Sequence, residues 1–401
     1  MAFSFLKRPA GNKKLGIYVH IPFCKSKCEY CDFYSLGGSR DRHVTDDYLQ
    51  ALADHIKESG RLAPEYVVDT VYFGGGTPSF FGAENLEKIL DEIQRRFRLD
   101  ADAEITLEAN PDSVTNQSLK KLLRAGFNRI SIGVQSDDDE MLKKLGRPHT
   151  YEQARQAVQR AREVGFANVS VDLMYGLPNQ TLTGWKETVE NVLTLKPDHL
   201  SAYALRVEEG TPLWNYRDCA NLPDDDRQAD MYLSACRILR DYGYEHYEIS
   251  NFAKPGFASR HNLKYWNLDE YLGFGPSAAS DFGGKRFSAV ADLRGYIDGI
   301  RQHGTILREC DAIPMRERAG EYVMLRLRTS LGIEEKEYET RFLMPFKPLE
   351  TLLTRFQTRG YTEKLEDGRW VLTEQGWLVS NQIIITLNEA QERSTPLAKK
   401  R

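Results

Sequence analysis

Six short strand-like runs, five of them with β-branched residues, alternate with amphipathic stretches over residues 15–245. Such alternation predicts a parallel sheet whose strands are joined by crossover helices. Six units are too few to close an eight-stranded TIM barrel, so we predict a partial, TIM-like α/β barrel. The expected strands are residues 16–20, 70–73, 104–108, 129–134, 168–173 and 199–204, and the expected helices are residues 46–58, 83–97, 117–125, 151–164, 183–195 and 224–242.

Three of the six cysteines, Cys24, Cys28 and Cys31, lie close together in the order C-x3-C-x2-C. Thiolates so near in sequence can converge on one soft metal centre, which indicates iron–sulfur or zinc. Three thiolates would bind three irons of a [4Fe-4S] cluster and leave the fourth iron open to a substrate. The alternative is a structural zinc site with His20 as fourth ligand. Disulfides are not expected, because the other cysteines are scattered singly and the sequence shows no secretory leader.

Glycines and polar residues lie where the expected strands end. A glycine triplet (74–76) follows the second strand, Glu108 ends the third, and Gln135 and Asp172 end the fourth and fifth. Each alone has a structural explanation, such as a turn or a helix cap. Together they should surround one site, because the carboxyl ends of the strands form the functional face of a parallel barrel. Glu108 suits an ammonium group and Arg147 a carboxylate, while Gln135 and Asp172 suit ribose hydroxyls.

The cysteine triplet, with an aromatic residue before its last member, resembles the signature of radical S-adenosylmethionine (SAM) proteins. The preceding YVHIPFC narrows the resemblance to the family of oxygen-independent coproporphyrinogen III oxidase (HemN) and its relative, the heme chaperone HemW. The resemblance implies a (β/α)6 barrel, a [4Fe-4S] cluster on Cys24, Cys28 and Cys31, and SAM as a second cofactor. The SAM-contacting positions that it implies are Tyr18, Tyr30, Gly75, Gly76, Thr77, Glu108, Gln135, Arg147 and Asp172.

A second motif, HNLKYW, begins at His261 and includes Tyr265 and Trp266. These residues could line a flat apolar cofactor, since histidine is the usual proximal ligand of heme iron. Composition alone favours a packing cluster of aromatic side chains. The pattern HNxxYW, however, resembles the motif that marks the HemW branch, where it is implicated in heme binding. The resemblance therefore implies heme as a third cofactor, bound by His261, Tyr265 and Trp266.

Two features separate the chaperones from the oxidases of the family. The oxidases carry a fourth cysteine two residues after the triplet, where this chain has Phe33, and a longer segment before the cysteine motif. We therefore expect a heme chaperone that delivers heme to an acceptor hemoprotein, with respiratory proteins as candidates, and no oxidase activity and no catalytic residues. The alternatives are an oxygen-independent coproporphyrinogen III oxidase and a zinc-stabilised α/β protein.

Net charge and hydropathy limit the classes of binding partner that we expect. Lys+Arg 54 against Asp+Glu 58 gives a formal net charge of −4, which offers no argument for binding nucleic acid. No run approaches the roughly 18 apolar residues of a membrane-spanning helix. We expect a cytoplasmic protein without a transmembrane segment, and peripheral membrane contact is left open.

The remaining segments complete the expected organisation. Residues 1–14 and 391–401 should be flexible tails, the first of them basic, and residues 246–310 should connect the barrel to a C-terminal domain. That domain, residues 311–390, is expected to be a smaller α+β, winged-helix-like unit. The elements expected beyond the barrel are a strand at 243–251, a glycine-rich turn at 271–280, helices at 314–327, 346–359 and 374–384, and a hairpin of strands at 361–366 and 369–372.

Overall fold

The fold is known from a computed structural model that describes residues 13–38, 41–218 and 221–397. Its main element is a twelve-stranded sheet in the order β14-β13-β12-β11-β1-β4-β5-β6-β7-β8-β10-β9. Six neighbouring strands at its centre run parallel and coincide with the six expected from the sequence. These strands are β1 (Lys13–Ile21), β4 (Tyr66–Gly75), β5 (Arg98–Ala109), β6 (Arg129–Gln135), β7 (Asn168–Tyr175) and β8 (His199–Ala204).

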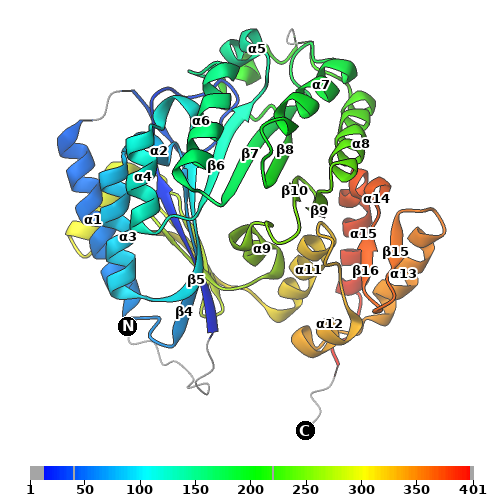
Figure 1. Cartoon of the computed structure of the whole chain (residues 1–401). Coiled ribbons are helices and arrows are strands. Elements are labelled where there is room, and N and C mark those ends of the chain that lie inside the picture. Colours follow the sequence, from blue (N-terminus) through cyan, green and yellow to red (C-terminus); the bar gives the residue numbers. More distant parts are fainter. Residues whose placement is uncertain (1–12, 39–40, 219–220, 398–401) are drawn as a thin grey trace.

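Helices cover the outer face of this curved sheet (Figure 1). The predicted partial barrel is therefore confirmed, and each predicted barrel helix is present within a few residues of its expected bounds. The covering helices are α1 (Arg42–Gly60), α3 (Ala83–Arg96), α4 (Asn116–Ala125), α6 (Tyr151–Val164), α7 (Leu182–Leu193) and α8 (Asp225–Asp241). Shorter elements in the connections are β2 (Phe23–Cys24), β3 (Leu36–Gly37), α2 (Pro78–Phe81), α5 (Asp139–Lys144) and the 3-10 helices η1 (Pro111–Ser113) and η2 (Pro212–Tyr216).

Apolar and polar side chains alternate along the strands, which gives the sheet one apolar face and one polar face. Val71, Leu107, Ile132 and Val171 are fully buried in the apolar core, whereas their neighbours Tyr72, Glu108, Ser131 and Asp172 line an internal cavity. Successive side chains of a strand point to opposite faces, so the apolar set faces the helices and the polar set faces the barrel interior. The strand register, which pairs Glu108 with Ser131 and Asp172 with Ser201, brings polar residues of neighbouring strands together.

Residues 246–310 differ from the expected connecting segment, because they add strands to the same sheet. The single strand expected at 243–251 is an antiparallel pair, β9 and β10. The expected turn at 271–280 contains β11, which pairs in parallel with β1, and β12. The elements of this part are β9 (Glu245–Glu248), β10 (Asn251–Ala253), α9 (Arg260–Asn267), β11 (Tyr271–Phe274), β12 (Ala279–Phe282), β13 (Lys285–Ala289), α10 (Leu293–Arg301) and β14 (Leu307–Ala312).

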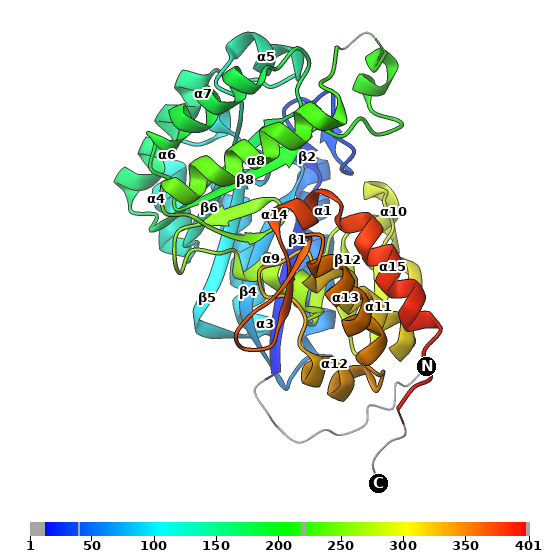
Figure 2. The same ribbon diagram turned by 90° about the vertical axis from the view of Figure 1, so that its right-hand side faces the viewer.

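The C-terminal elements gather beside the barrel, and Figure 2 shows α13 and α15 next to each other with α14 toward α8. The expected hairpin is present as β15 and β16. The single helix expected at 374–384 is divided at Val379 into two, and α12 was not predicted. The elements are α11 (Met315–Arg326), α12 (Glu335–Phe342), α13 (Lys347–Gln357), β15 (Thr362–Lys364), β16 (Trp370–Leu372), α14 (Glu374–Leu378) and α15 (Ser380–Glu392).

The ends of the described chain also differ from the prediction. Lys13 and Lys14, expected in a flexible tail, begin β1, because they pair with Tyr66 and Val67 of β4. Residues 391 and 392, expected in the C-terminal tail, belong to α15, and the Leu397 N–H donates to the Leu343 carbonyl at 2.8 Å. The rest of the basic N-terminal tail and residues 398–401 lie outside the described residues. Among the helices that the structure describes, none has the length and apolar character needed to cross a membrane.

Candidate metal and cofactor site

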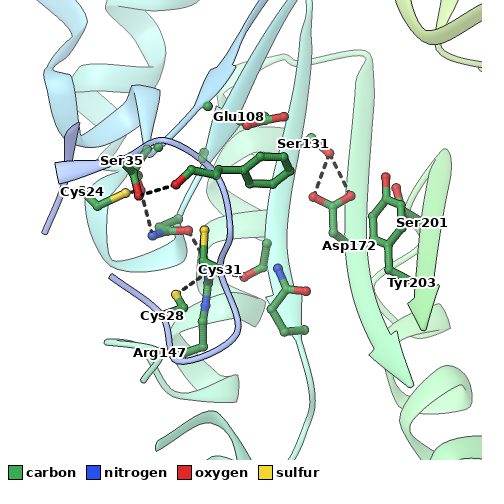
Figure 3. Close-up of a pocket in the computed structure, with 18 of the residues that line it drawn as sticks. Cys24, Cys28, Cys31, Ser35, Glu108, Ser131, Arg147, Asp172, Ser201 and Tyr203 are labelled. Atoms are coloured by element: carbon green, nitrogen blue, oxygen red, sulfur yellow. Dashed lines mark hydrogen bonds between the residues drawn. The ribbon is translucent and has the colours of Figure 1, made fainter. Parts of the chain in front are cut away.

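A cavity of about 330 Å³ opens at the carboxyl ends of β4 to β8. Eleven of the residues expected to bind the cluster or SAM line it, although they come from separate strands and loops. Figure 3 shows the cysteine-bearing loop on one side of this cavity and Asp172 with Tyr203 on the other. The expected residues found here are Cys24, Cys28, Tyr30, Cys31, Gly75, Gly76, Thr77, Glu108, Gln135, Arg147 and Asp172.

The three cysteines lie together at one end of the cavity as free thiols. The Thr77 hydroxyl lies 3.4 Å from Cys24 Sγ, and Arg147 Nη1 lies 3.6 Å from Cys28 Sγ. Hydrogen-bond donors of this kind stabilise thiolate ligands and adjust the reduction potential of an iron–sulfur cluster. His20 is turned elsewhere: Tyr18 Oη lies 3.1 Å from its Nδ1, and the Tyr34 carbonyl lies 2.8 Å from its Nε2. The zinc alternative with His20 as fourth ligand is therefore not supported.

Gly76, the residue after β4, brings the strand end close to the cysteine loop. The backbone N–H of Gly76 donates to the Ile21 carbonyl at 2.8 Å, and that of Thr77 donates to the Phe23 carbonyl at 2.8 Å. A Cβ atom at Gly76 would lie 2.9 Å from both carbonyl oxygens and 3.0 Å from Cys24 Sγ. Such contacts are too short for a side chain, so glycine is required for this approach.

Arg147 joins the cysteine end of the cavity to the strand ends. Its Nη2 donates to Asn110 Oδ1 at 2.7 Å and to the Gly133 carbonyl at 2.9 Å. Its Nε is buried and has no hydrogen-bond partner in the described structure. An orphaned donor on a buried guanidinium fits an anionic ligand group, as expected for the carboxylate of SAM.

The two cavity carboxyl groups differ in their surroundings. Burial raises the pKa of Glu108 to about 7, although a hydrogen bond from Tyr72 Oη at 2.7 Å opposes the shift. Burial also raises the pKa of Asp172, against the effect of the Ser201 and Ser131 hydroxyls. The Ser131 hydroxyl lies 3.1 and 3.2 Å from the two Asp172 oxygens. An ammonium group beside Glu108 would favour its charged form.

Gln135 lines the cavity at the end of β6 and has a strained backbone. Its φ is 68°, in the left-handed region, and the register with β7 shifts between Gly133 and Gln135. A non-glycine residue in this conformation costs free energy, which is tolerated most often at functional sites. The position therefore agrees with the ligand role expected for Gln135.

The structure places four of the expected cofactor residues away from the cavity lining. The ring of Tyr18 stacks on that of Tyr72, with centroids 6.3 Å apart, and only Tyr72 lines the cavity. His261 is buried in α9, with Nδ1 2.8 Å from Thr70 Oγ1 and Nε2 2.8 Å from Tyr265 Oη. Burial lowers the pKa of His261 to about 3, so its imidazole is neutral. Trp266 is partly buried on the same helix.

Several lining residues were not assigned a ligand role from the sequence. Asn110 donates from Nδ2 to Thr77 Oγ1 at 3.3 Å and accepts from Arg147, so it connects two predicted residues. Strand alternation could have identified most of them, because every second residue of β6 lines the cavity. The same is true of β8. The residues of these two series are Arg129, Ser131, Gly133 and Gln135 in β6 and His199, Ser201 and Tyr203 in β8.

Comparison with known proteins agrees with this geometry. Residues 18–192 match the radical SAM superfamily, and residues 313–379 match the HemN C-terminal domain. The structure of coproporphyrinogen III oxidase (HemN) from Escherichia coli superimposes with a TM-score of 0.82 at 25% sequence identity, over 94% of this chain and 90% of that one. The fold and the site thus define a radical SAM protein of the HemN type.

Sequence relatives place the chain more narrowly. It is 36% identical to the heme chaperone HemW of Bacillus subtilis, over 91% of this chain and 97% of that protein. It is 35% identical to HemW of Escherichia coli, over 92% and 97%. A mitochondrial radical SAM domain-containing protein 1 of Mus musculus is 34% identical, over 89% and 81%. The chain belongs to the HemW family.

Proposed function

We propose that this protein binds heme, delivers it to an acceptor hemoprotein, and holds a [4Fe-4S] cluster with SAM in the barrel cavity. The observation that carries the proposal is Phe33, which stands two residues after the cysteine triplet, where the oxidases of the family have a fourth cysteine. Its side chain lines the cavity and is 63% exposed. Phenylalanine supplies neither a thiol nor a proton, but it offers an apolar surface at the mouth.

The cavity residues fit both radical SAM cofactors. Cys24, Cys28 and Cys31 would hold the cluster, and Arg147 next to Cys28 would offset its negative charge. When bound, a cluster of this class supplies one-electron reduction of SAM. Glu108 would orient the amino group of SAM, and Asp172, held by Ser131, would accept hydrogen bonds from ribose hydroxyls.

The proposed heme ligand, His261, is held inside the barrel in the described conformation. Its two ring nitrogens face Thr70 and Tyr265, and a buried ion pair of 2.7 Å between Lys264 and Asp69 fixes the same helix. Ligation of heme iron by one ring nitrogen would break the hydrogen bond of that nitrogen, and α9 would have to move because His261 is buried. Tyr265 and Trp266 would then be released with it to contact the porphyrin.

A heme titration of the full-length protein tests this assignment. We expect His261→Ala to change the Soret spectrum or to lower heme occupancy, while the iron and sulfide of the cluster stay unchanged. His55→Ala is the matched control, because His55 is also a hydrogen-bonded histidine, 2.8 Å from Tyr296 Oη, but lies on α1. An unchanged Soret spectrum in His261→Ala, or the same change in both variants, would contradict ligation by His261.

A second function is favoured by the similarity to HemN, whose structure superimposes over 94% of this chain. Oxygen-independent oxidation of coproporphyrinogen III would use the same cluster and SAM site. The absence of a fourth cysteine beside the triplet argues against it. Anaerobic incubation of the cluster-loaded protein with SAM, a reductant and coproporphyrinogen III separates the two functions, because only an oxidase forms protoporphyrinogen IX.

A further inference from the structure

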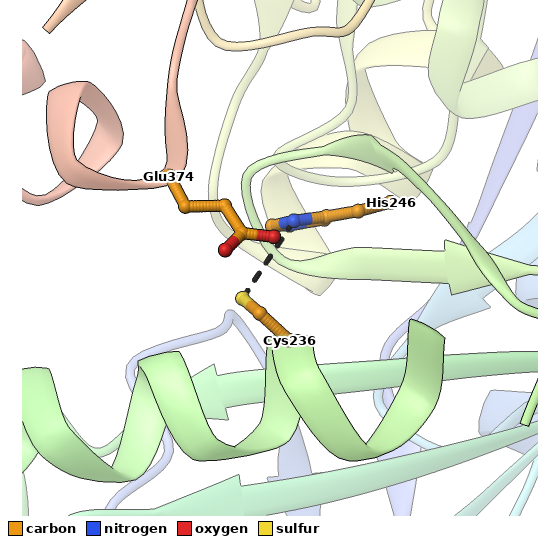
Figure 4. Close-up of side chains that lie close together, drawn as sticks. All are labelled: Cys236, His246 and Glu374. Atoms are coloured by element: carbon orange, nitrogen blue, oxygen red, sulfur yellow. Dashed lines mark hydrogen bonds between the residues drawn. The ribbon is translucent and has the colours of Figure 1, made fainter. Parts of the chain in front are cut away.

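A second cluster of metal-ligating side chains lies outside the cavity, where the barrel meets the C-terminal elements. Cys236 lies on α8, His246 on β9, and Glu374 begins α14 (Figure 4). One ligand atom from each, a thiol sulfur, an imidazole nitrogen and a carboxylate oxygen, lies within 4.8 Å of the other two. We propose that Cys236, His246 and Glu374 bind a divalent metal ion of the zinc type.

The spacing of the ligand atoms suits a tetrahedral ion. Cys236 Sγ and His246 Nδ1 are 3.7 Å apart. With a zinc–sulfur bond of about 2.3 Å and a zinc–nitrogen bond of about 2.0 Å, tetrahedral geometry separates these two atoms by about 3.5 Å. Thiolate, imidazole and carboxylate are also the three side-chain ligands that zinc uses. Small movements would therefore suffice to admit the ion.

The His246 ring is already held in the orientation that a metal requires. Its Nε2 lies 3.4 Å from the Ile249 carbonyl and 3.5 Å from the Tyr232 hydroxyl. Because a carbonyl can only accept, this contact favours the tautomer with the hydrogen on Nε2 and the lone pair on Nδ1, toward Cys236. Metal-binding histidines commonly donate their other N–H to a carbonyl in this way. The ring is stacked on Phe252 at 4.1 Å and meets the edge of Trp377 at 4.3 Å, so its rotation is restricted.

One carboxylate oxygen of Glu374 can bind the ion while the other forms an ion pair. Arg240, one turn after Cys236 on α8, forms an ion pair with Glu374 Oε1. A carboxylate has a second oxygen, so Oε2 can bind a metal while Arg240 holds the group in place. A thiolate and a carboxylate together would balance the charge of a divalent ion, and the guanidinium would act as an outer partner.

Such an ion would link two parts of the protein. α8 and β9 belong to the barrel side, whereas Glu374 lies within residues 313–379, the match to the HemN C-terminal domain. Three protein ligands leave the fourth position of a tetrahedral ion to water. The site is therefore expected to fasten α14 to α8, and its metal is additional to the iron bound by the cysteine triplet.

Metal analysis of the full-length, cluster-loaded protein tests the proposal. After dialysis against Zn²⁺ and removal of loose metal, we expect about one zinc per chain beside the cluster iron. Cys236→Ser and Glu374→Gln should each lower zinc affinity at least about tenfold and keep the iron. Cys310→Ser and Glu363→Gln, which alter an exposed cysteine and an exposed glutamate, should change neither metal.

Cobalt then identifies the ligands. In a full-length variant with Cys236 as the only cysteine, Co²⁺ should give a thiolate-to-cobalt absorption band, which His246→Gln should weaken. Circular dichroism checks that each variant is folded, and Glu374→Gln remains informative if Cys236→Ser unfolds, because the Glu374 side chain is 32% exposed. Two results would overturn the proposal: cluster-loaded protein that binds no zinc, or a Glu374→Gln variant that binds zinc as tightly as the wild type. Either would mean that Arg240 and Glu374 form only an ion pair.

Discussion

His261 stacks on Tyr72, with ring centroids 5.2 Å apart and ring planes inclined by 26°. Tyr72 in turn donates its hydroxyl hydrogen to Glu108 Oε1 at 2.7 Å. The histidine of the HNxxYW motif is thus two contacts away from the carboxyl group expected to bind the amino group of SAM. A movement of α9 that releases His261 would therefore also change the support of Glu108.

This contact predicts energetic coupling between His261 and Tyr72. Tyr72→Phe removes the hydrogen bond to Glu108 and should weaken SAM binding by about 0.5–1.5 kcal/mol. His261→Ala removes the ring that stacks on Tyr72 and should weaken SAM binding by no more than about 1.5 kcal/mol, the upper range for an aromatic pair. The double variant should lose less than the sum of the two, because both act through Glu108. Isothermal titration calorimetry of the cluster-loaded protein measures the affinities. Strictly additive losses would show that the two residues act independently.

The pKa of Glu108, raised to about 7 by burial, predicts a pH dependence of SAM affinity. Below that pKa the group is protonated and neutral, so its attraction for an ammonium group is lost; above it the attraction is present. Affinity should fall nearly tenfold between about pH 7.5 and about pH 6. The Glu108→Gln variant should bind SAM weakly, and the fall in SAM affinity that Glu108 causes over this pH range should be absent. Titration of SAM itself affects both proteins equally. The same pH profile in both would exclude Glu108 as its source.

The cysteine triplet predicts a cluster that no other residue can rescue. Anaerobically reconstituted protein should contain about four irons and four sulfides per chain, with absorbance that dithionite bleaches. Replacing Cys24, Cys28 and Cys31 together by alanine should abolish both. Cys310→Ala should keep both, because this exposed residue lies on β14. Zinc without iron in the wild type after reconstitution would contradict the cluster.

The ion pair that fixes α9 predicts a large effect on stability. The side chains of Lys264 and Asp69 are only 5% and 14% exposed and lie 2.7 Å apart. Lys264→Met should lower the free energy of unfolding by about 3–5 kcal/mol, because it leaves a buried carboxylate without its partner. The double variant Lys264→Met, Asp69→Leu should recover much of the loss. Urea unfolding measures both, and a loss below about 1 kcal/mol would mean that the pair is solvated.

Much of the barrel could be predicted because local pattern and tertiary structure agree there. Every central strand except β8 contains β-branched residues, and α4 and α6 end at Gly126 and Gly165, both in the left-handed conformation that the sequence signals. The cavity residues were found for a related reason: parallel topology gathers strand ends, so Glu108 and Asp172 could be placed together from the sequence.

The remaining differences depend on contacts distant in sequence. Gly273 suggests a turn, yet it lies in β11, where a Cβ would be 2.2 Å from the Ala279 carbonyl oxygen and glycine is therefore required. The β9–β10 pair turns at Ile249 and Ser250 without a glycine or proline. The burial of His261 depends on Thr70, 191 positions away. No local pattern in the sequence encodes such a contact.

The central claim is that the chain binds heme as a chaperone and does not oxidise coproporphyrinogen III. One preparation of cluster-loaded, full-length protein, titrated with heme and then incubated anaerobically with SAM, a reductant and coproporphyrinogen III, tests it most directly. The account predicts about one heme per chain by the Soret titration and no protoporphyrinogen IX. Steady formation of protoporphyrinogen IX by a protein that binds no heme would contradict it.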